Sequence, residues 1–167
     1  DKDQYFETVE QEIALLKKIS NCTKQMSSRR ENSKALFLAT RLDECDHVLA
    51  FDSIIITHSV IKKLLQKQLS GEAQVVIATG GRKGRGKQTI QDLFHPDSDS
   101  SKVIGLCTDA LSEGVNLQGS STVVFLDMPT VIRKAEQRAG RVDRLDSPHN
   151  RIDIYWPSDH EVFQLEV

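Results

Sequence analysis

Cysteine is scarce in this chain of 167 residues, and its scarcity excludes several classes of protein. The three cysteines, Cys22, Cys45 and Cys107, are widely spaced and form no C-x-x-C pair. An odd, scattered set of this kind indicates reduced thiols rather than a disulfide framework, and predicts an intracellular location in cytoplasm, nucleoid or nucleus. Cys45 and His47 form one ligand-like pair without a second pair, so we expect no metal site.

Long apolar runs and an excess of one charge are also missing. No run approaches the roughly 18 apolar residues of a membrane span, and no signal peptide is visible at the start, so we expect no membrane association. The formal net charge of −2 does not indicate a general affinity for nucleic acid, so any such surface has to be local. Because the first residue is Asp1 rather than Met, we expect an excised fragment or a processed chain.

What the chain does contain is a pattern of apolar residues typical of an α/β fold. Apolar residues make up 38% of the chain, enough for one globular domain of this length. Continuous apolar strands alternate with helices after residue 52, which indicates a parallel sheet covered on both faces. Trp156, in the last of these strands, is expected in the core. We divide the chain into an N-terminal helix with its connection, residues 1–32, and an α/β domain, residues 33–167.

The expected elements follow from the spacing of the apolar residues. Helical spacing predicts helices at 1 to about 26, 33–50, 60–69, 87–94 and 130–142. Short apolar or β-branched runs predict strands at 53–57, 73–79, 102–107, 122–126 and 151–156.

The most distinctive segment, Gln137 to Arg144, reads Q-R-A-G-R-V-D-R. Its spacing of three predicts that Arg138, Arg141 and Arg144 share one helical face. Three guanidiniums on one face repel one another and favour a polyanion as partner, although a solvated basic face is the alternative. A second distinctive segment lies upstream at residues 108–117 and reads T-D-A-L-S-E-G-V-N-L.

These two segments resemble motifs V and VI of the superfamily 2 helicases and translocases, and the similarity runs from about residue 54 to residue 156. The last motif is H-R-x-G-R-x-G-R in DEAD-box helicases and Q-x-x-x-R-x-x-R-I-G-Q in SWI/SNF-type translocases. This chain shares Arg138 with the first form and Gln137 with the second. Bacterial SWI/SNF-like enzymes that act with RNA polymerase resemble it further through Q-R-x-G-R-x-D-R. The sequence departs from the remodellers at Glu113 and at residues 145–147.

The resemblance implies a RecA-like parallel sheet with helices on both faces, which is the C-terminal lobe of a two-lobed, ATP-dependent helicase or translocase. The first lobe, which would bind the nucleotide and hold Mg²⁺, is expected upstream in the same polypeptide, so the isolated chain is expected to be an inactive half of an ATP hydrolase. The implied partner is nucleic acid, and the SWI/SNF-like features favour duplex DNA. The alternative is a non-hydrolysing module of the same fold that binds nucleic acid or another partner.

The resemblance also assigns roles to residues of the last motif. Arg141 and Arg144 match the two arginine fingers, whose fixed charge suits the γ-phosphate oxygens during hydrolysis. Gln137 is expected to sense the γ-phosphate in the same cleft. Arg138 is expected either to contact the nucleotide or to pair with an acidic residue as a structural brace.

The motif V segment supplies a second group of expected contacts. Asn116 matches the residue that faces the ribose, and Gly114 permits the tight turn before it. Thr108 is expected to contact the nucleic-acid backbone, and Asp109 to contact it or to couple the two sites. The structural alternative for Thr108 and Asp109 is a pair that caps the start of a helix.

A basic, glycine-rich loop follows the strand predicted at 73–79. Thr79, Gly80 and Gly81 resemble the T-G-x turn that lies beside the nucleic acid in helicases, and Arg82 and Lys83 would add phosphate contacts. A flexible surface turn is one alternative. The other is a P-loop, because the spacing G-x-x-x-x-G-K ends at residue 87, but residue 88 is Gln where Ser or Thr should reach Mg²⁺.

Thr57 and His58 lie at the end of the strand expected at 53–57, in the region of motif IV. This segment could place a hydroxyl or a backbone N–H near a phosphate of the nucleic acid. The alternative is an ordinary helix cap.

Overall fold

The computed structural model describes residues 2–80, 86–111, 115–129, 131–145 and 147–158. The chain divides into two compact units, Asp1–Arg30 and Glu31–Val167. The first unit consists mainly of helix α1 (Lys2–Gln25), as predicted, and its large apolar side chains are exposed, including Phe6, Ile13 and Leu16. None of the described helices is both long and apolar enough to cross a membrane.

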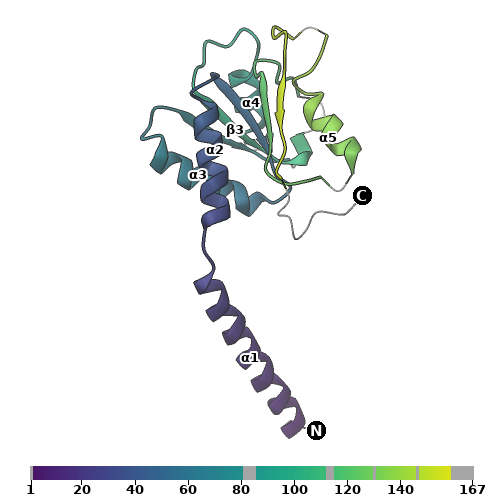
Figure 1. The fold of residues 1–167 in the computed structure, drawn as a ribbon. Helices are drawn as coiled ribbons and strands as arrows, with labels where there is room; N and C mark the ends of the chain where they lie inside the picture. Colours follow the sequence, from purple (N-terminus) through teal and green to yellow (C-terminus); the bar gives the residue numbers. More distant parts are fainter. Residues whose placement is uncertain (1, 81–85, 112–114, 130, 146, 159–167) are drawn as a thin grey trace. The chain divides into compact units, whose positions relative to one another are not determined.

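The second unit is an α/β domain built on one parallel sheet (Figure 1). The strands lie side by side in the order β2-β3-β1-β4-β5, and every pair of neighbours is parallel. This arrangement confirms the predicted fold class. In chain order the elements are α2 (Arg29–Arg41), β1 (His47–Phe51), α3 (Ile55–Gln68), β2 (Gln74–Ala78), α4 (Lys87–Leu93), β3 (Val103–Cys107), the 3₁₀ turn η1 (Asp109–Leu111), β4 (Thr122–Phe125), α5 (Ile132–Ala139) and β5 (Asp153–Tyr155).

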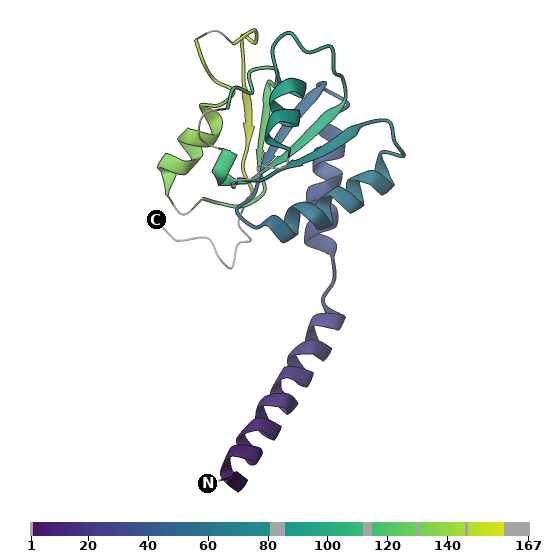
Figure 2. The same ribbon diagram turned by 180° about the vertical axis from the view of Figure 1, so that it is seen from behind.

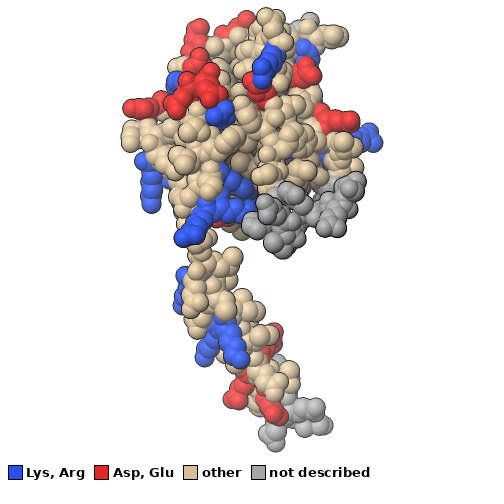
Figure 3. Space-filling model, in the orientation of Figure 1, with Lys and Arg blue, Asp and Glu red and all other residues tan. Residues whose placement is uncertain are grey.

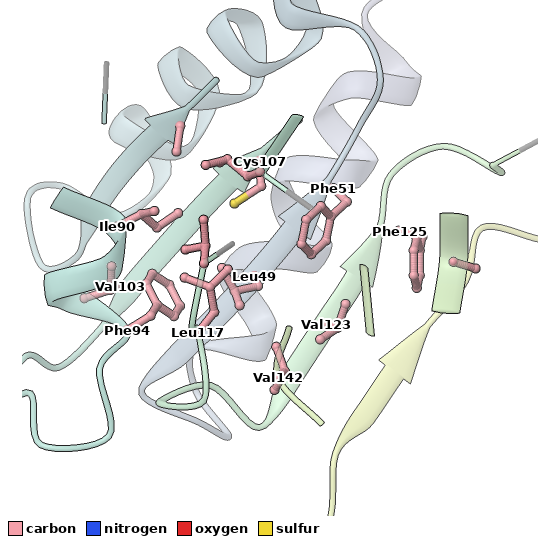
Figure 4. Close-up of a cluster of buried hydrophobic side chains, with 14 residues drawn as sticks. Leu49, Phe51, Ile90, Phe94, Val103, Cys107, Leu117, Val123, Phe125 and Val142 are labelled. Carbon is pink, nitrogen blue, oxygen red and sulfur yellow. The ribbon is translucent and has the colours of Figure 1, made fainter. Parts of the chain in front are cut away.

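Two hydrophobic cores lie on opposite faces of the sheet, because side chains alternate along each strand. Val48 and Ala50 of β1 belong to the core that includes buried residues of α2 and α3. Leu49 and Phe51 of the same strand belong to the other core, with residues of α4 and α5 (Figure 4). Helix α4 is seen in front of the sheet when the molecule is turned (Figure 2). The sheet is therefore covered on both faces, as the apolar strands predicted.

The packing of α4 against β3 depends on a residue without a side chain. A Cβ atom at Gly105 would lie 2.7 Å from Cδ1 of Ile90 in α4 and 3.1 Å from Cε2 of Phe94. The helix therefore packs directly on the backbone of a strand whose five residues are all buried.

The predicted elements between residues 33 and 57 are wrong. The helix expected at 33–50 ends at Arg41, and residues 47–51 form β1 instead. The residues expected as a strand at 53–57 lead into α3, which begins at Ile55, ends at Gln68 and includes nearly all of the helix predicted at 60–69. Apolar residues at helical spacing continue into β1, so periodicity alone extended the helix. The β-branched run Ile54–Thr57 favoured a strand locally, but its isoleucines are exposed at the start of a helix.

Two expectations at the C-terminal side also need correction. Helix α5 ends at Ala139 rather than residue 142, and a hydrogen-bonded turn continues to Asp143. Trp156 was expected in the core but is 48% exposed, with its ring stacked on Phe125 at a centroid distance of 4.3 Å. The other strands and helix α4 lie where the sequence predicted them.

Charges of both signs are interspersed over much of the domain face seen in Figure 3. This agrees with the net charge of −2 and means that no field of a single sign covers this face. Binding of a polyanion therefore depends on the local arrangement of individual side chains.

Candidate functional site

Polar residues gather where the strands of the sheet end. Ser53 follows β1, Gly80 follows β2, Asp109 follows β3 and Asp127 follows β4. The strands are all parallel, so these residues lie along one edge of the sheet. In open α/β sheets ligands bind outside the carboxyl ends of the strands, which makes this edge the candidate site.

Arg138 of α5 is the centre of an ion-pair network at this edge. Its side chain is completely buried, and its Nε donates to Oδ1 of Asp109 at 2.6 Å while its Nη1 donates to Oδ1 of Asp127 at 2.8 Å. Its Nη2 donates to Oγ of Ser53 at 3.3 Å. One guanidinium therefore joins the ends of three neighbouring strands to α5. We call these four residues, Ser53, Asp109, Asp127 and Arg138, the arginine clamp.

The surroundings of Asp127 in the clamp favour its charged form. Burial alone would raise the pKa of the Asp127 carboxyl, but hydrogen bonds from Ser53 and Arg138 outweigh it and hold that pKa below its usual value. The backbone N–H of Ser53 donates to Oδ2 of Asp127 at 2.8 Å. The guanidinium of Arg138 also lies over the rings of Phe51 and Phe125, at 5.8 and 5.3 Å from their centroids. The clamp is a satisfied network within the domain, so Arg138 has the geometry of the brace alternative.

The arginines of motif VI do not share one helical face, so that prediction is wrong. Helix α5 ends before Gly140, and the three arginines have different surroundings: Arg138 is buried, Arg141 is half-buried and Arg144 is exposed. The expected spacing of three assumed a helix that continues through Arg144. The turn instead separates the buried member from the two expected fingers. Gln137 lies exposed in the last turn of α5.

The segments that resemble motifs V and VI lie together in the fold. The N–H of Leu117 donates to the main-chain oxygen of Arg141 at 3.2 Å. Arg144 donates from Nη2 to the oxygen of Val115 at 3.2 Å and from Nε to the oxygen of Gly140 at 3.4 Å. The two segments are thus joined by main-chain contacts and by one of the expected fingers. The assignment of Arg141, Arg144 and Gln137 to catalysis stays a prediction.

The remaining motif V residues have local contacts that the sequence did not specify. Oδ1 of Asn116 accepts from the N–H of Gln118 at 3.3 Å, which stabilises a short turn and fixes the amide at the surface of this segment. Thr108 is buried at the end of β3, and its Oγ1 accepts from the N–H of Gly80 at 3.3 Å. Asp109 opens the 3₁₀ turn η1 and belongs to the clamp. Gly114 lies outside the described residues.

The nucleic-acid residues predicted after β2 are only partly described. Thr79 is half-buried and Gly80 is exposed, next to Thr108. The structure thus brings together two of the expected backbone contacts from different strands. Gly81, Arg82 and Lys83 lie outside the described residues, and the loop returns at Gly86, whose φ of +81° favours glycine.

The ring of His58 does not reach the surface of the domain. His58 belongs to the first turns of α3 and is completely buried, and Thr57 beside it is half-buried. The expected contact of a hydroxyl or main-chain N–H of this segment with a phosphate stays a prediction. The expectation assumed that these residues follow a strand, whereas they lie within a helix.

Sequence reasoning missed the acidic partners of Arg138. Neither Asp127 nor Ser53 was predicted as a partner of Arg138. Lys134 also contributes, with Nζ 3.5 Å from Oδ2 of Asp109. A signal existed, because Asp109 and Asp127 both follow buried strands of a parallel sheet.

Among the described residues, no group of three or more His, Cys, Asp or Glu side chains could hold a metal ion.

Comparison with known proteins places this site in a family. The sequence profile of the helicase conserved C-terminal domain matches residues 14–146. An uncharacterized ATP-dependent helicase, YqhH, of Bacillus subtilis is 29% identical over 126 residues, which cover 75% of this chain and 21% of that protein. The SNF2 domain-containing protein CLASSY 4 of Arabidopsis thaliana is 36% identical over 48% of this chain and 8% of its own length. The RNA polymerase-associated protein RapA of Erwinia tasmaniensis is 39% identical over 38% of this chain and 6% of its own length.

Solved structures share the fold at low sequence identity. The C-terminal part of the Fun30 ATPase domain superposes with a TM-score of 0.61 at 19% identity, covering 86% of this chain and 47% of that one. Domain 2 of the DEAD-box helicase Mss116p, bound to an RNA duplex, gives a TM-score of 0.60 at 14% identity, covering 77% of this chain and 50% of that one. The chain spans about a fifth or less of the relatives named above. It belongs to the helicase conserved C-terminal domain family and has the RecA-like fold predicted for such a lobe, and its similarity to SNF2-domain and RapA proteins agrees with the predicted SWI/SNF-like branch.

Proposed function

We propose that this chain is the finger-bearing lobe of an ATP-dependent translocase that moves along nucleic acid, most readily duplex DNA. The observation that carries the proposal is the junction of motifs V and VI at the carboxyl edge of the sheet. There Arg144 binds the main chain of Val115, and the arginine clamp fixes α5 a few residues away. Hydrolysis would require the first lobe, which is expected upstream in the longer protein.

The residues at this edge fit a nucleoside triphosphate. Arg141 and Arg144 carry permanent positive charge, and Gln137 and Asn116 offer amide groups, so the set suits phosphate oxygens and a ribose. ATP would supply the phosphoryl group that is transferred to water. Arg144 is exposed, and two of its three nitrogens bind main-chain carbonyls, which orients the guanidinium toward one side. Mg²⁺ would be held by carboxylates of the first lobe.

Arg138 would act on the fingers indirectly. Its side chain is buried within the clamp, so it fixes the end of α5 and thereby the start of the turn that carries Arg141 and Arg144. A finger has to be held in place before the reaction to stabilise charge that develops in the transition state. The clamp provides this support from the ends of β1, β3 and β4.

Nucleic acid would be held by the other strand ends. Thr108 and the N–H of Gly80 are joined across β2 and β3, and the loop with Gly81, Arg82 and Lys83 begins beside them. Contacts from a hydroxyl, main-chain N–H groups and cationic side chains suit the phosphate backbone, which predicts weak sequence preference and binding that weakens with salt.

The proposal is tested by Arg144→Ala in the full-length protein. Removal of an arginine finger is expected to lower ATP turnover by roughly 10³–10⁵, while binding of duplex DNA is retained. Arg151→Ala is the matched control, because Arg151 is an exposed arginine that pairs with Asp153 of β5, away from the clamp. Unchanged turnover in Arg144→Ala would refute the finger assignment. Full-length protein that binds DNA without any ATP turnover would favour the non-hydrolysing binding module instead.

A further inference from the structure

His58 is the buried polar residue that the proposed function leaves unexplained. The ring is completely buried in the first turns of α3, and neither Nδ1 nor Nε2 has a hydrogen-bond partner among the described residues. Buried polar atoms are nearly always paired, and an apolar side chain could fill the same space without that cost. The imidazole therefore calls for an explanation other than packing.

The clamp contacts the segment that leads into the helix of His58: Ser53, just before α3, donates its N–H to Oδ2 of Asp127 at 2.8 Å, and its Oγ accepts from Nη2 of Arg138 at 3.3 Å. Four charged residues, contributed by the end of β1, the end of β4, α5 and α2, influence the pKa of His58. Asp52 and Asp127 favour the protonated ring, whereas Arg138 and Lys34 favour the neutral ring. Lys34 pairs with Asp52 at 3.6 Å, and Arg138 pairs with Asp127 at 2.8 Å. His58 is thus influenced by two ion pairs, one of which belongs to the arginine clamp.

The neutral ring is the form that suits the closed clamp. Burial lowers the pKa of His58 below its usual value; the two carboxylates oppose this effect, and the two cations reinforce it. The ring also lies near the N-terminus of α3, where the helix dipole disfavours a positive charge. If Arg138 moves away from Asp127, one cation that opposes protonation is lost and one carboxylate is left unpaired. Both changes favour a proton on His58.

We propose that His58 is a positioning residue: its neutral imidazole permits the closed arginine clamp, and its protonation weakens the pairing of Arg138 with Asp127. Thermodynamic linkage requires the reverse as well, so that opening the clamp promotes protonation. The consequence for turnover rests on the proposed function, because Arg138 is three residues before Arg141 and acts on the fingers through the turn at Gly140.

The linkage is measured on this chain without ATP. Histidine labelled with ¹³C in the ring is followed by NMR from roughly pH 5 to 8, and the signal of His58 is identified by its absence in His58→Gln. Arg138→Gln is expected to raise the proton affinity of His58 severalfold, up to roughly tenfold, because it removes a positive charge that disfavours the protonated ring. Lys134→Gln is the matched control: it removes a cation that touches Asp109 but is not among the main charges that act on His58.

A second variant predicts a shift in the opposite direction. Asp127→Asn removes a charge that favours the protonated ring, so it is expected to lower the proton affinity of His58, and it carries the test should Arg138→Gln fail to fold. The linkage would be overturned if the proton affinity of His58 stayed within twofold of its value in the unchanged protein in both variants. It would also be overturned if Lys134→Gln changed this affinity as much as they do.

The functional consequence is measured in the full-length protein. ATP turnover is expected to fall as the pH is lowered, with the same midpoint that NMR gives for His58. His58→Gln cannot take up a proton at this position, so it is expected to lose this acid limb of the pH profile. An unchanged acid limb in His58→Gln would overturn the positioning role. If Arg144→Ala leaves turnover intact while the NMR linkage holds, the finger assignment fails and the coupling of His58 to the clamp stands.

Discussion

Removing Asp127 from the arginine clamp gives a prediction whose size follows from the burial of its partner. Breaking a buried ion pair costs about 3–5 kcal/mol when one charge is left without a partner. Here Arg138 is completely buried, but Asp109 remains as a second acceptor and the Asp127 side chain is 21% exposed. We therefore expect Asp127→Ala to lower the free energy of unfolding by about 2–3 kcal/mol. At about 2–4 °C per kcal/mol for a domain of this size, the melting temperature should fall by about 4–12 °C.

Urea unfolding followed by the fluorescence of Trp156 measures this loss. Trp156 is the single tryptophan, and its ring is stacked on Phe125 two residues before Asp127, so its emission reports the edge of the sheet that the variant changes. An unchanged slope of the free energy against urea shows that the variant unfolds from the same native fold.

Lys134→Ala is the control for Asp127→Ala. Lys134 is half exposed and lies 3.5 Å from Asp109, so its loss should cost no more than about 1 kcal/mol. A double variant of Asp127→Ala with Arg138→Met should cost less than the sum of the two single variants by about 0.5–3 kcal/mol, because they remove the same interaction. If Asp127→Ala costs no more than Lys134→Ala, or if the two clamp variants add fully, the clamp does not stabilise the domain.

Three further predictions concern other parts of the domain. Gly86→Ala should lower the free energy of unfolding in urea by roughly 1–3 kcal/mol, because φ is +81° and the new Cβ would clash with the main-chain oxygen of Ile77. A loss below about 0.5 kcal/mol would contradict this expectation. Burial lowers the pKa of His58 in the folded state below 6.5, so the native state binds fewer protons than the unfolded chain. The contribution of the neutral ring to the free energy of unfolding is complete above pH 6.5 and is lost as the pH falls, and His58→Gln should lose less stability than the unchanged protein between a pH above 6.5 and a pH below it. Burial raises the pKa of the Cys107 thiol, so this thiol should react with a thiol reagent only after unfolding, whereas exposed Cys22 should react in the native protein. Equal reaction rates of the two cysteines in the native protein would contradict the packing of β3.

The sequence predicted the parts of the fold in which local pattern and tertiary structure agree. Strands β2 to β5 lie where apolar runs predicted them, and α4 follows the glycine-rich loop as expected. The first strand failed because Leu38, Leu42 and Leu49 continue a helical spacing, whereas the pairing of residues 47–51 with β3 and β4 decides the outcome. That pairing joins residues more than 50 positions apart, and no window of the sequence contains it.

The candidate site was predictable in its composition but not in its contacts. The motif pointed to Arg138, and the brace was one of its two expected roles. Its partners lie 85 residues away at Ser53 and 11 residues away at Asp127, just after the ends of two different strands. Which carboxylate meets which arginine depends on strand order, and that order is a property of the folded sheet. The burial of His58 likewise followed only from the placement of α3.

The strand order also has a consequence for how the chain is made. β1 and β2 are synthesised first, yet they are not neighbours; each pairs with β3, which begins at Val103. About 50 residues separate the end of β1 from the start of β3, which corresponds to roughly 3–10 s of translation. During that interval the nascent chain has no native strand pair, and the apolar segment Val48–Phe51 presents two open edges. A product that stops before residue 103 would contain two strands that cannot form a sheet together, and should aggregate or be degraded rather than accumulate.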